Sequence, residues 1–293
     1  MLLHAGSAPD LNFEAFRRQL REFGIVEGQN LVVEDRWGEG EPDRLPDLAV
    51  DLVQQKVDLL LAGGTAPIQA LKQATTTIPI VMAVSGDPVG SGLVASLARP
   101  GANVTGLSIL APELTGKRLE LIKEMVPALS DVAVLSNQAN PHRLLEFAWA
   151  ANSAQVLGLR LTLYAVRNAS EVQSALSTLT GAHAQAVVVL GDPLLFSHRV
   201  KVAEVAVKSG IPLLSDQAAF VEAGALLSYA ANYADLYRQA ASYADQILRG
   251  AKPADLPVQQ ATRFELVINL KTAKALGITI PQSILMRADR VIQ

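Results

Sequence analysis

The sequence predicts an α/β fold with two lobes, each built around a sheet of parallel strands. At 293 residues, the chain exceeds the length that one hydrophobic core usually serves, so two domains of similar size are expected. Short β-branched apolar runs alternate with segments of helical periodicity, which indicates βαβ units. The two halves of the chain repeat this alternation in the same order, so the two lobes should be alike.

Strand and helix signals alternate throughout the first half. Short apolar runs predict strands over 1–4, 30–37, 57–62 and 78–84. Apolar residues at helical spacing predict helices over 13–23, 42–55 and 63–74, the first of them ended by Gly24. We also expect a short helix over 90–97 and a turn over 98–102, before 104–110 leaves the lobe.

The second half follows the same plan. Apolar runs predict strands over 132–135, 159–166, 186–190 and 211–214. A helix is expected after the loop 136–141, running to Leu157, and further helices are expected over 170–179 and over 195–208. The remaining chain predicts a strand ending at Tyr229, a helix over 233–248, a strand over 264–269 and a short helix before Gly277.

The carboxyl-terminal part is expected to pass between the lobes. We therefore predict a first lobe of 1–109 plus about 230–262, and a second lobe of 110–229 plus about 263–293. Loops that follow parallel strands gather at one edge of each sheet, and the two edges should face each other across a ligand cleft. The hinge would then consist of several chain segments rather than one linker.

Composition excludes several classes of function. A net charge of -3 without basic runs gives no sign of a nucleic-acid partner, and the absence of cysteine excludes disulfides and thiolate chemistry. No apolar run approaches the roughly 20 residues that cross a bilayer. The four histidines have no metal-ligand spacing, and neither a dinucleotide fingerprint nor a P-loop pattern is present, so we expect no metal and no cofactor.

Three aspartates follow predicted strands and are candidates for a ligand ammonium group. They are Asp87, Asp192 and Asp216. A carboxylate there would pair with the ammonium of a zwitterion while donors elsewhere hold its carboxylate. For each aspartate, capping of a turn or a helix is as strongly expected as ligand contact. Ligand contact is somewhat more expected for Asp87, because Gly86 and Pro88 fix the backbone around it.

Polar loop residues supply possible partners for the rest of a ligand. Thr65 and Ala66 begin a predicted helix after Gly63-Gly64, where free N–H groups suit a carboxylate, although an ordinary helix cap fits as well. Ser7, Asn137 and Asn140 follow the first strand of each half and are candidates for hydrogen bonds at the cleft. Asn140 precedes a proline and is as easily a helix cap.

Aromatic residues are few, so their positions are informative. Phe196 lies just after Gly191-Asp192-Pro193, and Tyr229 ends a strand, so both are candidates for stacking on an apolar ligand group. Core packing is the commoner use of such residues. Trp37 and Trp149 are interpreted as structural.

Several motifs in one order resemble a known family. They include GDPVGSGLVASLARPGANVTGLS from Gly86, PELTGKRLELIKE from Pro112, REFGIVEGQN from Arg21 and FVEAGALLSY from Phe220, and GAKPADLPVQQATRFELVINLKTAKALGITIP from Gly250. Together they resemble the ABC transporter substrate-binding proteins that include tryptophan-binding members, with the Rossmann-like lobes of the type I periplasmic-binding-protein fold. The resemblance spans nearly the whole chain.

The resemblance implies a solute-binding protein that works with an ABC permease in the membrane. It implies an amino acid or a related aromatic or aliphatic carboxylate as ligand, and an extracytoplasmic location. Residues 1–4 read as the end of a strand, so we expect an exported precursor whose leader is absent from this chain. We expect a monomer.

Two other classes of function are alternatives to solute binding. A Rossmann-type enzyme would need a nucleophile, a base or a cofactor loop, and the sequence shows no convincing set of these. A ligand-sensing domain of a receptor or regulator would use the same fold, but no DNA-binding or membrane segment accompanies it here. Binding without chemistry is the function that the sequence favours.

Overall fold

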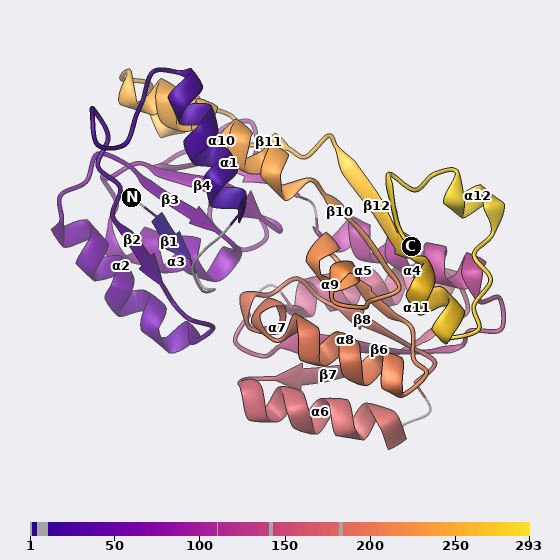
Figure 1. Ribbon diagram of the computed structural model, residues 1–293. Helices are drawn as coiled ribbons and strands as arrows, with labels where there is room; N and C mark the ends of the chain where they lie inside the picture. Colours follow the sequence, from indigo (N-terminus) through magenta and orange to yellow (C-terminus); the bar gives the residue numbers. More distant parts are fainter. Residues whose placement is uncertain (1, 5–10, 110, 141–142, 182–183) are drawn as a thin grey trace. The chain divides into compact units, whose positions relative to one another are not determined.

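The structure is a computed structural model that describes residues 2–4, 11–109, 111–140, 143–181 and 184–293. It is a mixed α/β protein with parallel sheets, as the sequence predicts (Figure 1). The chain divides into two compact units. Unit 1 comprises Met1–Leu110 and Asn232–Arg263, and unit 2 comprises Ala111–Ala231 and Phe264–Gln293.

Unit 1 contains a sheet of parallel strands in the order β11-β5-β4-β3-β1-β2. The strands are β1 (Leu2–His4), β2 (Asp35–Trp37), β3 (Leu60–Gly63), β4 (Ile80–Ser85), β5 (Val104–Ser108) and β11 (Gln259–Gln260). The helices are α1 (Leu11–Glu22), α2 (Leu45–Gln54), α3 (Thr65–Ala74) and α10 (Tyr233–Leu248), with 3₁₀ turns at Pro42–Arg44 and Pro253–Asp255. Helices α1 and α10 contact each other on one face of the sheet, and α2 and α3 contact each other on the opposite face (Figure 1).

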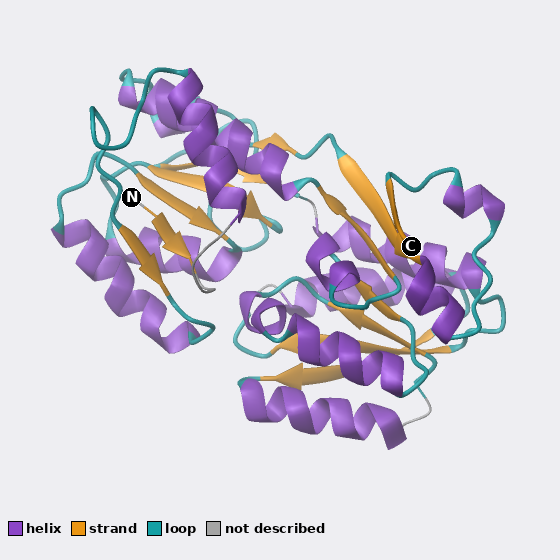
Figure 2. Cartoon of the chain, viewed as in Figure 1, coloured by secondary structure: helices purple, strands orange, loops and turns teal. Residues whose placement is uncertain are grey.

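Unit 2 contains a sheet in the order β13-β12-β10-β9-β8-β6-β7. The strands are β6 (Asp131–Asn137), β7 (Arg160–Val166), β8 (Ala186–Val189), β9 (Leu213–Ser215), β10 (Leu227–Ala231), β12 (Phe264–Asn269) and β13 (Arg290–Ile292). The helices are α4 (Ala111–Met125), α5 (Arg143–Val156), α6 (Ala169–Gly181), α7 (Pro193–Ser197), α8 (Arg199–Lys208), α9 (Ala218–Glu222), α11 (Leu270–Ala275) and α12 (Gln282–Leu285). Figure 2 shows these helices around the sheet, whose two faces carry separate apolar cores.

The repeated pattern in the sequence corresponds to a repeated topology. The order β2-β1-β3-β4-β5 in unit 1 has its counterpart in β7-β6-β8-β9-β10 of unit 2. In each unit the chain starts at an inner strand, pairs outward once, and then adds strands on the other side, as in flavodoxin-like sheets. The carboxyl ends of the inner strands therefore meet at one edge in each unit.

The structure differs from the sequence-based expectation in several elements. No helix forms over 90–97, because Gly92 has a left-handed φ of 69° and the amides of Leu93 and Val94 both bond to the carbonyl of Pro88. The predicted helix 195–208 is interrupted at His198, which separates α7 from α8. Strand β12 runs antiparallel to β10, so the sheet of unit 2 is not wholly parallel.

Two predicted strands begin later than expected. The run 30–37 forms a strand only from Asp35, and the run 57–62 only from Leu60. Both strands flank β1, whose register pairs Leu2 with Asp35 and with Leu61. Strands β2 and β3, on the two sides of β1, are therefore both shortened at their amino ends.

Gly106 in β5 is required by a close approach between neighbouring strands. Its φ is 132°, and a Cβ atom there would lie 2.3 Å from the carbonyl oxygen of Met82 in β4. A side chain at this position would need both a disfavoured backbone conformation and a displacement of the β4 backbone.

We predict that Gly106→Ala destabilises the protein by about 2–4 kcal/mol, because backbone strain and overpacking act together. The free energy of unfolding from urea titrations measures this effect. Gly250→Ala is the matched control, since Gly250 has a φ of 101° but nothing within 4 Å of the added Cβ. Equal losses in the two variants would show that the contact with β4 adds nothing.

Candidate functional site

Polar residues from three neighbouring strands gather at the carboxyl edge of the sheet in unit 2. Asn137 ends β6, Asp192 follows β8 and Asp216 follows β9, and all three side chains are buried. These strands are adjacent in the order β9-β8-β6. The sequence-predicted residues Asn137, Asn140, Asp192 and Asp216 therefore belong to one region of unit 2.

Asp192 is the hydrogen-bonding centre of this region. Its Oδ1 accepts the Nδ2–H of Asn137 at 2.9 Å and the N–H of Leu194 at 2.8 Å, and its Oδ2 accepts the Nδ2–H of Asn140 at 3.2 Å. Asp192 is also the N-cap of α7. The helix-cap role predicted as an alternative is thus present, and the same carboxylate fixes two asparagines.

The electrostatic state of Asp192 reflects its burial. Desolvation raises the pKa of this carboxyl to about 6, although hydrogen bonds from Asn137, Leu194 and Asn140 act in the opposite direction. Burial therefore outweighs the hydrogen bonds that favour the ionised form, and the pKa of Asp192 lies near 6.

Asp216 lies close to the backbone of the neighbouring strand end. It is 4% exposed, and its Oδ1 accepts the hydroxyl of Ser215 at 3.3 Å. Its Oδ2 occupies the space beside Gly191, where a Cβ atom would lie 2.1 Å from that oxygen. Gly191 is therefore required for the present position of the Asp216 carboxylate.

A buried network that the sequence did not reveal lies in helices α4 and α5. Nη1 of Arg118 donates to Oγ1 of Thr115 at 3.0 Å, and this hydroxyl donates to Oε1 of Glu146 at 2.9 Å. Nε of Arg118 donates to the carbonyl oxygen of Tyr229 in β10 at 2.9 Å. Arg118 is only 1% exposed, so its charge is held inside unit 2.

Glu146 interacts electrostatically with the aspartates at the strand ends. Its pKa is raised to about 7, because burial and the charges of Asp216 and Asp192 together outweigh the opposing effects of Arg118 and of the hydrogen bond from Thr115. The influence of both aspartates shows that the three carboxyl groups share one electrostatic environment. Arg118 and Glu146 are charged residues on otherwise apolar faces of α4 and α5, which is a signal that the sequence contains. Their interaction with each other depends on tertiary structure.

The carboxyl edge of unit 1 offers backbone donors at the start of α3. Thr65 and Ala66 begin α3 directly after β3, and Gly64 is the N-cap with a φ of 95° and no side-chain capping bond. Thr65 is buried and Ala66 is half-buried. The first N–H groups of this ten-residue helix are the ones that an anion can use.

Asp87 follows β4 in unit 1 and closes a turn. Its Oδ1 accepts the N–H groups of Val89 at 3.1 Å and of Gly90 at 2.8 Å. This is the turn-capping geometry that we gave as the alternative to ligand contact. Ligand contact through Asp87 stays a prediction. Ser7 lies outside the described residues.

The two aromatic candidates pack against other side chains. Phe196 meets Phe220 edge-on at 6.4 Å between ring centroids, and the guanidinium of Arg199 lies 4.5 Å from the centroid of the Phe196 ring. Tyr229 stacks on Phe264 with centroids 6.0 Å apart. Both rings are half-buried, so core packing is present and ligand stacking stays a prediction.

Three further observations concern Trp149, metal binding and membrane spans. Trp149 is 47% exposed on α5, so the structural role that we predicted is not one of core packing. Within the described residues, no group of histidine, aspartate and glutamate side chains has an arrangement suited to a metal ion. No helix among them has the length and apolar character that a membrane span requires.

Comparison with known proteins identifies several similar chains. The curated tyrosine-binding protein of Clostridioides difficile is 30% identical over 265 residues, which cover 90% of this chain and 76% of that protein. The crystal structure of a conserved domain protein from Vibrio cholerae has 32% identity and a TM-score of 0.92, with 99% of this chain and 98% of that chain covered.

A second solved structure carries an amino acid. It is an ABC domain from Streptococcus pneumonia in complex with L-Trp, and it is 31% identical with a TM-score of 0.92, covering 99% of this chain and 98% of that chain. More distant solute-binding proteins share the fold alone, which is that of type I periplasmic binding proteins.

The family model described as ABC transporter substrate binding protein matches residues 4–292. The resemblance predicted from the sequence motifs is thereby confirmed. This chain belongs to the ABC transporter substrate-binding protein family.

Proposed function

We propose that this protein is the solute-binding component of an ABC importer and that its ligand is an amino acid with an aromatic side chain. The ligand is held without chemical change and is presented to a permease in the membrane. The protein works outside the cytoplasm as a monomer. Closure of its two units around the ligand provides the signal for transport.

The observation that carries this proposal is the group of buried carboxyls in unit 2. Asp192, Asp216 and Glu146 share one environment that contains a single buried guanidinium, that of Arg118, among the described residues. A ligand ammonium would add a positive charge where negative charge is in excess. We assign the ammonium to Asp216, whose buried carboxylate lies beside the strand end at Gly191.

The ligand carboxylate requires donors of the opposite character. The amino end of α3, with Thr65 and Ala66, provides N–H groups and a hydroxyl in unit 1. We propose that the two ends of the zwitterion are bound by different units, so that a bound ligand stabilises the closed state. Asn137 and Asn140 supply further hydrogen bonds.

The aromatic preference rests on two relatives and on the composition of unit 2. The curated relative is named a tyrosine-binding protein, and the relative from Streptococcus was solved with L-Trp. In this chain, Phe196 and Tyr229 lie on elements that adjoin the strand ends. We propose that one edge of these rings bounds the ligand side chain.

We predict that Asp216→Asn weakens binding of tryptophan or tyrosine by at least tenfold, because a charge-assisted bond to the ammonium is lost. Gly191→Ala should weaken binding in the same way, because its Cβ displaces the Asp216 carboxylate. Isothermal titration calorimetry against a panel of aromatic and aliphatic amino acids measures both effects.

Asp43→Asn is the control, since Asp43 is an exposed aspartate in the 3₁₀ turn of unit 1. Its affinity should equal that of the wild-type protein. Unchanged affinity in Asp216→Asn, with a wild-type circular dichroism spectrum, would remove Asp216 from the site. Binding of sugars alone would contradict the proposed ligand class.

We predict that the free energy of unfolding falls as pH rises from about 5 to 7. The pKa of Glu146 is raised to about 7, and that of Asp192 to about 6, in the folded state. The folded protein therefore binds more protons than the unfolded chain over this range, and the stability present at low pH is lost as pH passes the folded pKa values. Urea titrations at several pH values measure the slope.

Glu146→Gln should remove the contribution of Glu146 to this pH dependence. That contribution is a change in the free energy of unfolding on the order of 3 kcal/mol between pH 4 and 7. Glu120→Gln is the control on the exposed side of α4, and its slope should match that of the wild-type protein. A slope that is unchanged in Glu146→Gln would show that Glu146 is ionised throughout this range.

A further inference from the structure

The chain passes between the two units at three connections, and each connection is short. The first lies before Ala111, where α4 begins, the second after Ala231, where β10 ends, and the third before Phe264, where β12 begins. Only Asn232 separates β10 from α10, and only 261–263 separate β11 from β12. A change in the arrangement of the units must therefore be taken up by a few residues at the ends of these elements.

The second and third connections leave unit 2 as one paired segment. Strands β10 and β12 are antiparallel, and their ladder runs to the pair of Ala231 with Phe264. Beyond that pair, the N–H of Asn232 donates to the carbonyl oxygen of Arg263 at 3.1 Å. The ring of Tyr229 stacks on that of Phe264. The backbone at these two connections is therefore held as a two-stranded unit.

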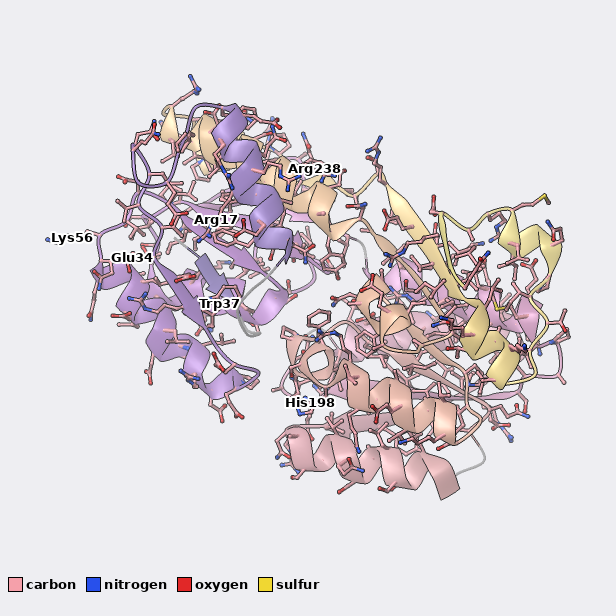
Figure 3. The ribbon with its side chains drawn as sticks, in the orientation of Figure 1. Arg17, Glu34, Trp37, Lys56, His198 and Arg238 are labelled. Atoms are coloured by element: carbon pink, nitrogen blue, oxygen red, sulfur yellow. The ribbon has the colours of Figure 1, made fainter. Side chains whose placement is uncertain are left out.

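The second connection leads directly into a capped helix of unit 1. Asn232 is the N-cap of α10, and its Oδ1 accepts the N–H of Asp235 at 2.7 Å. The carboxylate of Asp235 accepts Nη2–H of Arg238, which is labelled in Figure 3, at 3.1 Å. Because a paired strand ends on one side of Asn232 and a capped helix begins on the other, a change of direction here is confined to the backbone around Asn232.

Arg118 of α4 holds the strand end from which the second connection starts. Its Nε donates to the carbonyl oxygen of Tyr229. In an antiparallel ladder, hydrogen-bonded pairs alternate with pairs whose carbonyl groups point away from the partner strand. Asn232 belongs to a hydrogen-bonded pair, so Tyr229, three residues earlier, directs its carbonyl away from β12 and toward the side of β9. Among the described residues, the ladder with β9 reaches only Ser228, so the guanidinium binds a carbonyl that lies beyond this ladder.

The other side of Arg118 leads to the carboxyls of the proposed ligand site. Nη1 of Arg118 donates to Thr115, whose hydroxyl donates to Glu146, and all three side chains are buried. The charges of the two aspartates at the strand ends act on Glu146. One buried network of hydrogen bonds therefore joins a carboxyl group beside these aspartates to the carbonyl of Tyr229.

Close packing of α4 on α5 fixes the spacing of this network. A Cβ atom at Gly116 would lie 2.5 Å from Oγ of Ser153. The two helices thus approach each other closely beside Thr115, with little room for adjustment. Helix α4 also begins directly after the first connection. Arg118 therefore lies on an element that starts at one connection and binds the strand that ends at another.

We propose that Arg118 is a positioning residue that couples occupation of the ligand site to the paired backbone of β10 and β12, and thereby to closure of the two units. This inference rests on the ligand site at Asp216 proposed above. An ammonium bound there offsets negative charge near Glu146 and stabilises its ionised form, which is the stronger acceptor for Thr115. A hydroxyl that donates more strongly is also a better acceptor for Arg118. A bound ligand therefore fixes the guanidinium, and with it the strand end.

The test uses Thr115→Val, which removes the hydroxyl between Arg118 and Glu146 and keeps a similar side-chain shape. Thr272→Val is the matched control, because the hydroxyl of Thr272 is also buried in unit 2 and donates to the carbonyl oxygen of Gly224 at 2.9 Å, outside the network. Both variants should lower the melting temperature, since each leaves a buried group without its hydrogen-bond partner.

Binding of L-tryptophan and L-tyrosine in titration calorimetry separates the two variants. Thr115→Val should weaken binding by about fivefold or more, whereas Thr272→Val and the conservative Thr115→Ser should bind as the wild-type protein does. In the Asp216→Asn background, Thr115→Val should have a smaller effect, because the two positions act through one charge. Equal fold losses in both backgrounds, or equal losses in Thr115→Val and Thr272→Val, would overturn the proposal.

Closure is measured by energy transfer between dyes on two introduced cysteines, Gln54→Cys in α2 and Lys201→Cys in α8. Both positions are exposed, they lie in different units, and the chain contains no other cysteine. At saturating tryptophan, the ligand-induced change in transfer efficiency should fall by at least half in Thr115→Val and persist in Thr272→Val. A change of wild-type size in Thr115→Val would overturn the proposal.

The ligand-free protein gives a test that does not depend on the proposed ligand. Arg118→Lys keeps the charge but loses the planar guanidinium that donates to Tyr229 and Thr115 together. Amide hydrogen exchange over 229–232 and 263–266 should be at least tenfold faster in this variant, with wild-type exchange in β7. Unchanged exchange over these residues would overturn the proposal. Failure of the wild-type protein to bind either amino acid would contradict the proposed ligand and not the role of Arg118, which the exchange measurement decides by itself.

Discussion

The shared order of five strands in each unit is the constraint on which the rest of this structure depends. Parallel strands present their carboxyl ends at one edge, and the order β9-β8-β6 brings together the ends that carry Asp216, Asp192 and Asn137. None of these residues is close to the others in sequence. Their proximity follows from topology, and the same topology in unit 1 places the start of α3 at the corresponding edge.

Burial of charge is the second theme of the site. Three carboxyl groups are removed from water beside one guanidinium, and each is held by hydrogen bonds from amides or hydroxyls. Such an arrangement contributes little to stability unless every partner is present, and removal of one partner leaves a buried charge without compensation. The raised pKa values of Glu146 and Asp192 result from the free-energy cost of removing these carboxylates from water.

The sequence predicted the fold class, most strands and helices, and the residues at the strand ends, because each of these depends on local periodicity or on loop chemistry. The helix expected over 90–97 was wrong, since Leu93 and Val94 are buried from within turns rather than from one face of a helix. Arg118 and Glu146 were missed because their interaction joins two helices, and a single sequence does not pair distant charges. The turn-capping contacts of Asp87 and the packing of Phe196 likewise emerged only from tertiary structure.

Neither compact unit corresponds to one continuous stretch of the gene. Helix α4, which follows β5, belongs to unit 2, and helix α10, which follows β10, belongs to unit 1, so the polypeptide passes between the units at three places. After a single proteolytic cut at any one of these connections, two other connections still join unit 1 to unit 2. Neither unit is therefore obtained by simple truncation. During synthesis, each unit receives its last segment only after most of the other unit has been made.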